Sequence, residues 1–229
     1  MTLTNLLAYY KLDTDSNDSS GNGVNGADTA ITYSPAIINN GAVFGSTSNI
    51  ICPSLPIAGA TALSISFWIK KTSAKTSVIL SSYNAVVGGH QMANVITASN
   101  TIRFVISSDG STDNFGETPA ITTGVWYHIF SVFDGSQTGD ANIIKIYING
   151  VLQTLTFTGT MGNVIAPTNY NLWIASLVGN QAALYLDGML DEVAIWKSVG
   201  TQQDALDLYA NGGGLQYPLK KRGSFSQFF

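Results

Sequence analysis

Residues 185–196 have the sequence Tyr-Leu-Asp-Gly-Met-Leu-Asp-Glu-Val-Ala-Ile-Trp, and this stretch decides how we interpret the rest of the chain. Apolar and polar side chains alternate around a glycine, which is typical of a β-strand with one face toward a core. Successive side chains of a strand point to opposite faces, so either Asp191 or Glu192 must point inward unless a bulge at Gly188 redirects it. The pattern leaves open which of the two is the inward carboxylate, and either one needs a partner there.

A second acidic segment, residues 13–23, directly follows the first expected strand at residues 6–12. It is rich in Asp, Ser, Asn and Gly and so offers many oxygen atoms, although the same composition is typical of a solvated loop of Asx turns. Backbone N–H groups or Lys11 are alternative partners for the inward carboxylate. We predict that the two ends of the chain meet, with this loop beside residues 185–196.

The composition excludes several classes of function. Only 10% of the 229 residues are charged, against about 25% in typical soluble domains. The net charge of −4 argues against nucleic acid as a partner, because clustered Lys and Arg bind phosphates. No window reaches the roughly 18 apolar residues of a membrane span, and the N-terminus does not resemble a secretory signal, which predicts synthesis in a cytosol. The single Cys52 cannot form an intramolecular disulfide, and we expect it to be buried.

Hydrophobic alternation predicts about a dozen short strands and one late helix. The clearest strand is residues 63–70, where the core face carries Leu63, Ile65, Phe67 and Ile69. Asn149-Gly150 is a strong hairpin turn between two such runs. A helix is expected after Thr201, which forms a capping-box variant with Asp204. The pattern predicts an all-β antiparallel sandwich over residues 1–212, with one short C-terminal helix, followed by a tail at residues 213–229.

Six segments together resemble the laminin-G-like domains of the concanavalin A-like lectin/glucanase superfamily. They are Leu7-Ala8-Tyr9-Tyr10-Lys11-Leu12, Asp18-Ser19-Ser20-Gly21-Asn22-Gly23, Ser64-Ile65-Ser66-Phe67-Trp68-Ile69, Trp126-Tyr127-His128, Lys145-Ile146-Tyr147-Ile148-Asn149-Gly150 and Leu190-Asp191-Glu192-Val193-Ala194-Ile195-Trp196. The resemblance implies a jelly-roll fold whose N-terminal strand lies near the C-terminal one.

This family often carries one structural calcium ion, and the resemblance implies Asp18, Asn22 and Asp191 as its ligands. Calcium prefers six to eight oxygen ligands, which a Gly-rich acidic loop can supply. Alternatives stay open, because Glu192 competes with Asp191 and other aspartates flank the loop, namely Asp13, Asp15 and Asp28.

The sequence predicts a protein that binds and does not catalyse. Glucanases of this fold use two carboxylates about 5 Å apart on one strand, whereas Glu117 and Glu192 are the only glutamates and neither has a carboxylate two residues away. His128 is expected to be a hydrogen-bonded structural residue, because no nucleophile motif accompanies it. His90 is expected in a loop, where a ligand or interface contact is the alternative. Three aromatic residues are expected in the core or at an interface, with stacking on a sugar ring as the alternative: Tyr83, Tyr170 and Trp173.

The tail is basic and aromatic, unlike the body. Its partner-binding candidates are Lys220, Lys221, Arg222, Phe225, Phe228 and Phe229. We expect it to dock on a neighbouring protein subunit, because exposed aromatic side chains form an adhesive patch; an unstructured end is the alternative. These features predict a virion surface component, such as a phage head-decoration, fibre or tail-surface protein. A carbohydrate-binding module of a secreted or surface protein is the alternative, and both are compatible with a displayed domain that binds glycans.

Overall fold

The computed structural model describes residues 3–84, 89–177 and 184–216. Sheet A contains β1 (Leu6–Tyr10), β3 (Thr32–Pro35), β4 (Asn40–Phe44), β6 (Ala62–Lys71), β11 (Trp126–Asp134), β12 (Ile144–Ile148), β13 (Val151–Leu152) and β16 (Gly188–Trp196). Sheet B contains β2 (Ala27–Thr29), β5 (Asn49–Ser54), β7 (Ser77–Asn84), β8 (Gly89–Ile96), β9 (Ile102–Ile106), β10 (Asn114–Glu117), β14 (Thr156–Thr158) and β15 (Asn171–Ile174). The helical segments are α1 (Asp140–Ile143), α2 (Gln202–Tyr209) and η2 (Ala210–Gly212).

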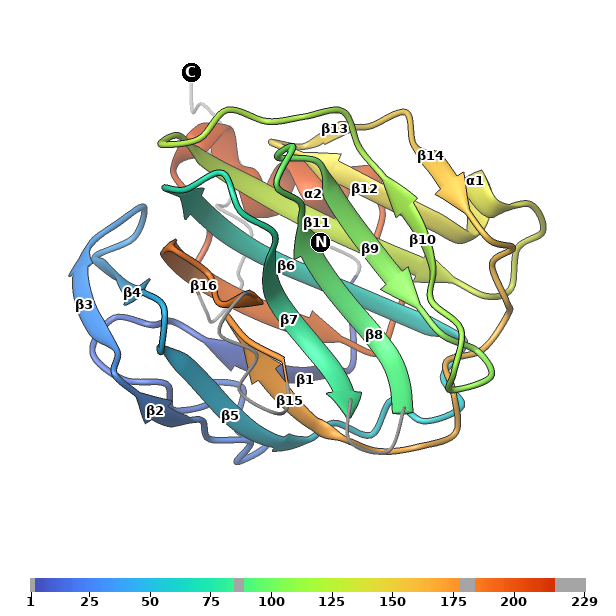
Figure 1. The fold of residues 1–229 in the computed structure, drawn as a ribbon, viewed down its shortest axis with the longest axis horizontal. Helices are drawn as coiled ribbons and strands as arrows, with labels where there is room; N and C mark the ends of the chain where they lie inside the picture. Colours follow the sequence, from blue (N-terminus) through green and yellow to red (C-terminus); the bar gives the residue numbers. More distant parts are fainter. Residues whose placement is uncertain (1–2, 85–88, 178–183, 217–229) are drawn as a thin grey trace, which may run out of the picture.

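The two sheets stack face to face as an antiparallel sandwich (Figure 1). Sheet A has the order β13–β12–β11–β6–β16–β4–β3, and sheet B has the order β14–β10–β9–β8–β7–β15–β5–β2. The predicted all-β antiparallel sandwich with one short C-terminal helix is confirmed. No helix in the described ranges is both long and apolar enough to cross a membrane.

The main core lies between the sheets, as the alternation of β6 predicts. Leu63, Ile65, Phe67 and Ile69 are fully buried in it, and Cys52 lies in the same cluster. The Asn149-Gly150 turn joins β12 to β13 with both residues at positive φ, 52° and 78°, as its sequence predicts.

A second, smaller core covers the outer face of sheet A. Ala205 and Leu208 of α2 pack on outward-facing side chains of this sheet, among them Phe130 and Trp196. The predicted capping box of α2 is present, because Thr201 and Asp204 each accept the other's backbone N–H. The helix therefore buries a face of β6 that its polar alternation would leave in water: Ser64, Ser66 and Trp68 are all buried.

β16 changes its outer partner halfway along. Residues 188–190 pair with β4, whereas residues 193–196 pair with β1, on the same edge. The register against β6 shifts between Asp191 and Ala194, and Glu192 has a φ of 53°, in the left-handed region. The bulge therefore lies beyond Gly188, at the acidic pair itself, and both Asp191 and Glu192 are buried. The expected meeting of the first and last strands is present.

Candidate functional site

The outer face of sheet B carries a row of side chains that crosses six strands. The pairing is in register from Phe115 on β10 through Val105, Ala93, Ser81 and Trp173 to Ile51 on β5. The neighbours of these residues along the strands, such as Phe104, Leu172 and Cys52, lie in the core. Because side chains alternate along a strand, the row itself points away from the core.

A cavity of about 200 Å³ opens on this face over β7, β8 and β9. We call it the sheet B cavity. Its apolar lining includes Val78, Ala93, Val95 and Val105 from the strands, together with Leu177 and Leu184 from the connection that leads to β16. Its polar lining includes Tyr83, His90, Gln91 and Asp113. An apolar cavity with a few polar groups at one end is the usual form of a small-ligand site.

The polar end of the sheet B cavity is a chain of three side chains. The rings of Tyr83 and His90 meet edge to face with centroids 4.2 Å apart. Nδ1 of His90 lies 2.8 Å from Oδ1 of Asp113, and 49% of the Asp113 side chain is exposed. Burial, and next the negative charge of Asp113, raises the pKa of Tyr83, so its hydroxyl stays neutral at physiological pH. The group thus offers hydroxyl, imidazole and carboxylate atoms at one end of an apolar cavity.

Local structure explains why these side chains converge. The β7–β8 register shifts between Ser82 and Tyr83, which places Tyr83 opposite His90. The buried Gln91 fixes the shift, since its Oε1 accepts from Ser82 Oγ at 2.6 Å and its Nε2 donates to the carbonyls of Ala166 and Thr168. The polar end therefore rests on a fixed backbone irregularity.

Asp113 is held by the turn that precedes it. Oδ1 of Asp109 accepts the backbone N–H groups of Ser111 and Thr112, each at 2.8 Å. These hydrogen bonds lower the pKa of Asp109, so the turn stays anchored by a carboxylate. On the strand side, the His90 N–H donates to the carbonyl of Gly110 at 3.0 Å, which joins this turn to β8.

Asp18 and Asn22, the predicted calcium ligands of the first loop, are engaged by the protein itself. Oδ1 of Asp18 accepts the N–H groups of Tyr9 and Ser20, and its Oδ2 accepts from Ser20 Oγ and the N–H of Val24, all within 3.1 Å. The Asn22 amide donates to the carbonyls of Leu6 and Leu7. The side chain of Asp18 therefore forms an Asx turn within the loop, and the side chains of Asp18 and Asn22 hold the loop against β1.

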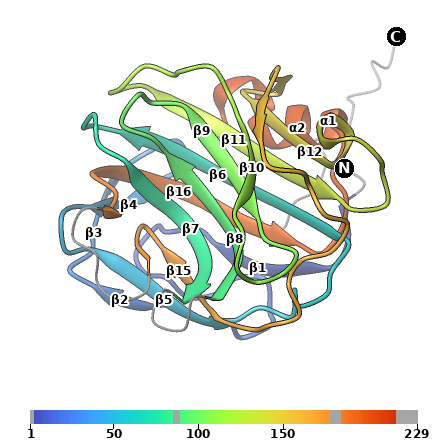
Figure 2. The ribbon, with the colours of Figure 1, turned by 45° about the vertical axis from the view of Figure 1, so that its right-hand side comes forward.

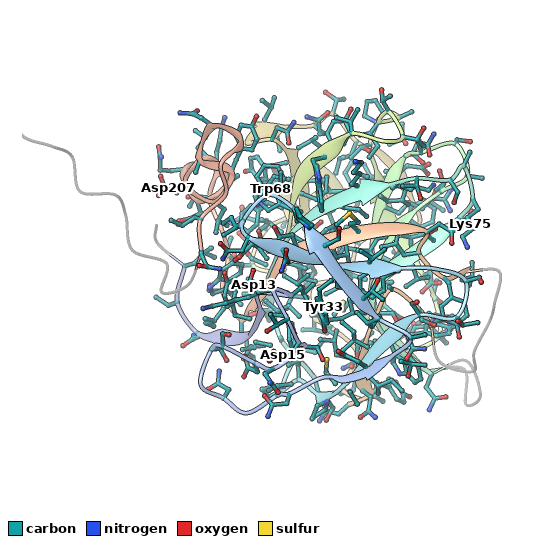
Figure 3. All side chains as sticks on the ribbon, turned by 90° about the vertical axis from the view of Figure 1, so that its left-hand side faces the viewer. Asp13, Asp15, Tyr33, Trp68, Lys75 and Asp207 are labelled. Carbon is teal, nitrogen blue, oxygen red and sulfur yellow. The ribbon has the colours of Figure 1, made fainter. Side chains whose placement is uncertain are left out.

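Asp191, the third predicted ligand, lies in a different environment. Its Oδ2 accepts the backbone N–H groups of Ile37 and Ile38 at 3.1 and 2.9 Å, in the turn between β3 and β4. Burial raises its pKa to about 7, and the nearby charge of Asp13 adds to the effect. Figure 3 views this side of the molecule, with Asp13 between Trp68 and Tyr33 in the picture, and Asp207 of α2 and Lys75 at opposite edges. Asp13 is thus the carboxylate whose charge acts on Asp191.

Glu192 completes this acidic seam, which we define as Asp13, Asp191 and Glu192. The Gln216 amide donates to both Asp13 Oδ2 and Glu192 Oε1, at 3.3 and 3.2 Å. Burial raises the pKa of Glu192 to about 8. Asp191 Oδ1 and Glu192 Oε2 are buried and have no hydrogen-bond partner in the described part of the chain.

Two orphaned carboxylate oxygens fit a hard cation, which prefers oxygen ligands. In the first loop, by contrast, both carboxylate oxygens of Asp18 already accept hydrogen bonds from the protein. Across the described ranges, however, no three His, Cys, Asp or Glu side chains form a cluster arranged to hold a metal ion. Calcium held by Asp18, Asn22 and Asp191 stays a prediction.

The remaining polar candidates have structural surroundings. His128 is buried, and its Nε2 lies 2.8 Å from Ser66 Oγ. Glu117 is paired with Arg103 at 2.9 Å, and Asp187 is paired with Lys75 at the same distance. Tyr170 and Trp173 line a second cavity, near the end of the β7–β8 pair. The tail candidates, Lys220 through Phe229, lie outside the described residues.

The sequence model of the Concanavalin A-like lectin/glucanases superfamily matches residues 44–205. The chain belongs to this family, and the expected resemblance is confirmed. No curated protein matches the chain.

Several solved structures share the fold. Domain 4 of AbnA, an extracellular arabinanase from Geobacillus stearothermophilus solved in complex with arabinotriose, is 22% identical with a TM-score of 0.63, over 90% of this chain and 98% of that one. The binding domain of Paraclostridial Mosquitocidal Protein 1 is 15% identical with a TM-score of 0.71, over 91% of this chain and 52% of that one. The receptor-binding domain of botulinum neurotoxin D is 15% identical with a TM-score of 0.67, over 91% of this chain and 53% of that one. The chain therefore spans about half the length of the toxin domains.

Proposed function

We propose that this protein is a non-enzymatic glycan-binding domain and that the sheet B cavity receives the sugar. The observation that carries the proposal is the placement of Tyr83, His90 and Asp113 at one end of an apolar cavity on an outer sheet face. A sugar ring has apolar C–H faces and a rim of hydroxyl groups. The valine and alanine side chains of the cavity match the C–H faces, and the carboxylate and imidazole match the hydroxyls.

The alternative of hydrolysis has less support. Glycoside hydrolysis needs two carboxyl groups flanking the bond that is cut. Asp113 is the one carboxylate that lines the sheet B cavity among the described residues, while Glu117 is paired with Arg103 and Glu192 is buried. The arrangement therefore favours holding a sugar over cutting it. The structurally similar arabinanase domain was solved in complex with arabinotriose, which supports a sugar as the ligand. This chain shares the fold of that domain and no more.

The test is a binding screen followed by variants. The full chain is applied to a printed array of neutral and acidic glycans, and the strongest ligand is then titrated into Tyr83→Ala and Asp113→Asn by calorimetry. We expect both variants to weaken binding at least tenfold, which corresponds to about 1.4 kcal/mol. The matched control is Tyr33→Ala, because Tyr33 lies on β3 of the other sheet (Figure 3). An empty array, or a ligand that both variants bind normally, would contradict the proposal.

A finer proposal is that this domain is displayed on a virion or another extracellular particle. Its support is the basic and aromatic composition of the tail. Removal of residues 217–229 tests it and spares Gln216, which contacts Asp13 and Glu192. We expect native mass spectrometry to show an oligomer for the full chain and fewer subunits for the truncated chain. The same number of subunits in both proteins would argue against docking through the tail.

A further inference from the structure

A second cavity lies at the rim of the sandwich, beside the end of the β7–β8 pair. We call it the rim cavity. It has a volume of about 330 Å³ and is lined by Asn84, Asn169, Tyr170, Asn171 and Trp173. Three amides and two aromatic rings line it, and no charged side chain does so among the described residues.

This set of groups has a definite chemistry. An Asn side chain offers two N–H donors and a carbonyl acceptor, which suits adjacent hydroxyl groups, and aromatic faces suit C–H surfaces. Asn169 and Asn171 are exposed, so their amides face solvent and are accessible to a ligand. The indole N–H of Trp173 is buried and has no acceptor within the described ranges. A neutral sugar supplies both hydroxyl acceptors and apolar faces without requiring a counter-charge.

The rim cavity and the sheet B cavity are neighbours. Tyr83 lines the sheet B cavity, while the next residue, Asn84, lines the rim cavity. On the paired strand, His90 belongs to the sheet B cavity, whereas a side chain at Gly89 would collide with the Tyr170 ring of the rim cavity. Glycine at position 89 thus makes room for Tyr170, and the two cavities meet at the same end of β7 and β8.

We propose that the rim cavity is a second sugar subsite and that one neutral oligosaccharide contacts both cavities. This inference rests on the proposed glycan-binding function. The carboxylate of Asp113 in the sheet B cavity repels anionic sugars, and none of the described residues that line the rim cavity carries a positive charge to attract them, so the ligand is a neutral glycan with several sugar units. Neighbouring strands are about 4.8 Å apart, and the three steps from β15 across β7 and β8 to β9 span about 14 Å, so a single sugar unit is too short.

The test uses neutral glycans of increasing length on the same array, with sialylated glycans of matched length beside them. We expect strong binding for neutral chains of about three units or more, weak binding for the monosaccharides, and no gain from sialylation. Arabinose, arabinotriose and arabinopentaose are titrated separately as a defined neutral series. Strong binding of sialylated glycans alone, or equal affinity for monosaccharides and longer chains, would overturn the inference.

Variants separate the two cavities. Asn171→Ala removes an exposed amide and Trp173→Ala removes the ring, and each is expected to weaken binding of the longest bound neutral glycan about tenfold while leaving monosaccharide binding unchanged. Trp173→Phe keeps a ring and is expected to retain most of the affinity. Trp126→Ala is the matched control, because Trp126 is a half-buried tryptophan of β11 in the other sheet.

The outcomes distinguish this inference from the proposed function. If Tyr83→Ala abolishes binding and neither rim variant changes it, the rim cavity is not a subsite, and glycan binding stands. If calorimetry gives two ligands per chain, the cavities act separately and the single-ligand inference fails. If no glycan binds, both proposals fail together.

Discussion

His128 gives the sharpest prediction for the folded protein, namely that stability falls in mild acid because of this one side chain. Only 1% of the residue is exposed. Its ring packs against Trp68, with centroids 5.2 Å apart, and under Tyr209 of α2, while Ser66 supplies one hydrogen bond. Its Nδ1 is buried without a hydrogen-bond partner in the described chain. Burial lowers the pKa of His128 to about 3, from about 6.5 in an unfolded chain.

The sign follows from the proton count. Between pH 6.5 and pH 3 the unfolded chain binds a proton at His128 and the folded chain does not, so acid favours unfolding. At roughly 1.4 kcal/mol per pH unit, the loss reaches about 3 kcal/mol at pH 4.5 and about 5 kcal/mol near pH 3. The stabilising contribution is therefore fully present above about pH 6.5 and declines below it.

The assay is the free energy of unfolding from urea denaturation at pH 7 and pH 4.5, for the natural chain and for His128→Gln. Glutamine can still hydrogen-bond to Ser66 but does not titrate. We expect the natural chain to lose about 3 kcal/mol more than the variant between the two pH values. Carboxylate titrations affect both proteins and cancel in the difference. His90→Gln is the control at the other histidine and should keep the full loss; an equal pH dependence for His128→Gln would refute the reasoning.

Three further predictions concern other parts of the fold. Saturating calcium, at 100 times its dissociation constant, should stabilise the natural chain by about 2.7 kcal/mol in thermal melts, and Asp191→Asn should lose this gain. The same melting temperature with calcium and with a chelator would exclude the ion. Burial lowers the pKa of Lys71 to about 8. Between pH 8 and pH 10.5 the unfolded chain binds more protons than the folded chain, so the free energy of unfolding should rise with pH in this range. Urea titrations at several pH values should show this rise for the natural chain and not for Lys71→Met. Thr201→Ala should cost about 1 kcal/mol in urea titrations by removing the N-cap of α2, and no loss would mean that packing alone holds the helix.

Much of the fold could be predicted because its signals are local. The alternation of β6, the Asn149-Gly150 turn and the capping box at Thr201 each depend on a few consecutive residues, and the structure contains all three. The strands that the sequence did not reveal are short. β2, β3 and β14 lie at sheet edges, and β10 lies next to the edge strand β14. β2 is fully exposed and β3 ends in Pro35, so neither has the buried alternation on which the prediction relies.

The candidate site was less predictable because its determinants are not local. Tyr83 meets His90 only through a register shift, and that shift is fixed by Gln91 bonding to carbonyls more than seventy residues away. The acidic pair shows the same limit. Strict alternation places one of Asp191 and Glu192 inward, yet both are buried because β16 changes from β4 to β1 at that point. A partner change between distant strands leaves no mark in the strand's own sequence.

The two outer faces of the sandwich differ in a way that bears on function. On sheet A, α2 packs over Phe130 and Trp196, so the helix takes up the apolar surface that this sheet presents. In Figure 2, α2 lies near β12, well away from β5 and β15, so it does not cover the end of sheet B that carries the rim cavity. The outward row of sheet B, from Phe115 to Ile51, meets instead two cavities lined by aromatic and amide or acidic groups. The helix thus covers the outer face of sheet A, whereas both cavities lie at sheet B, and this asymmetry supports the proposal that the ligand binds at sheet B.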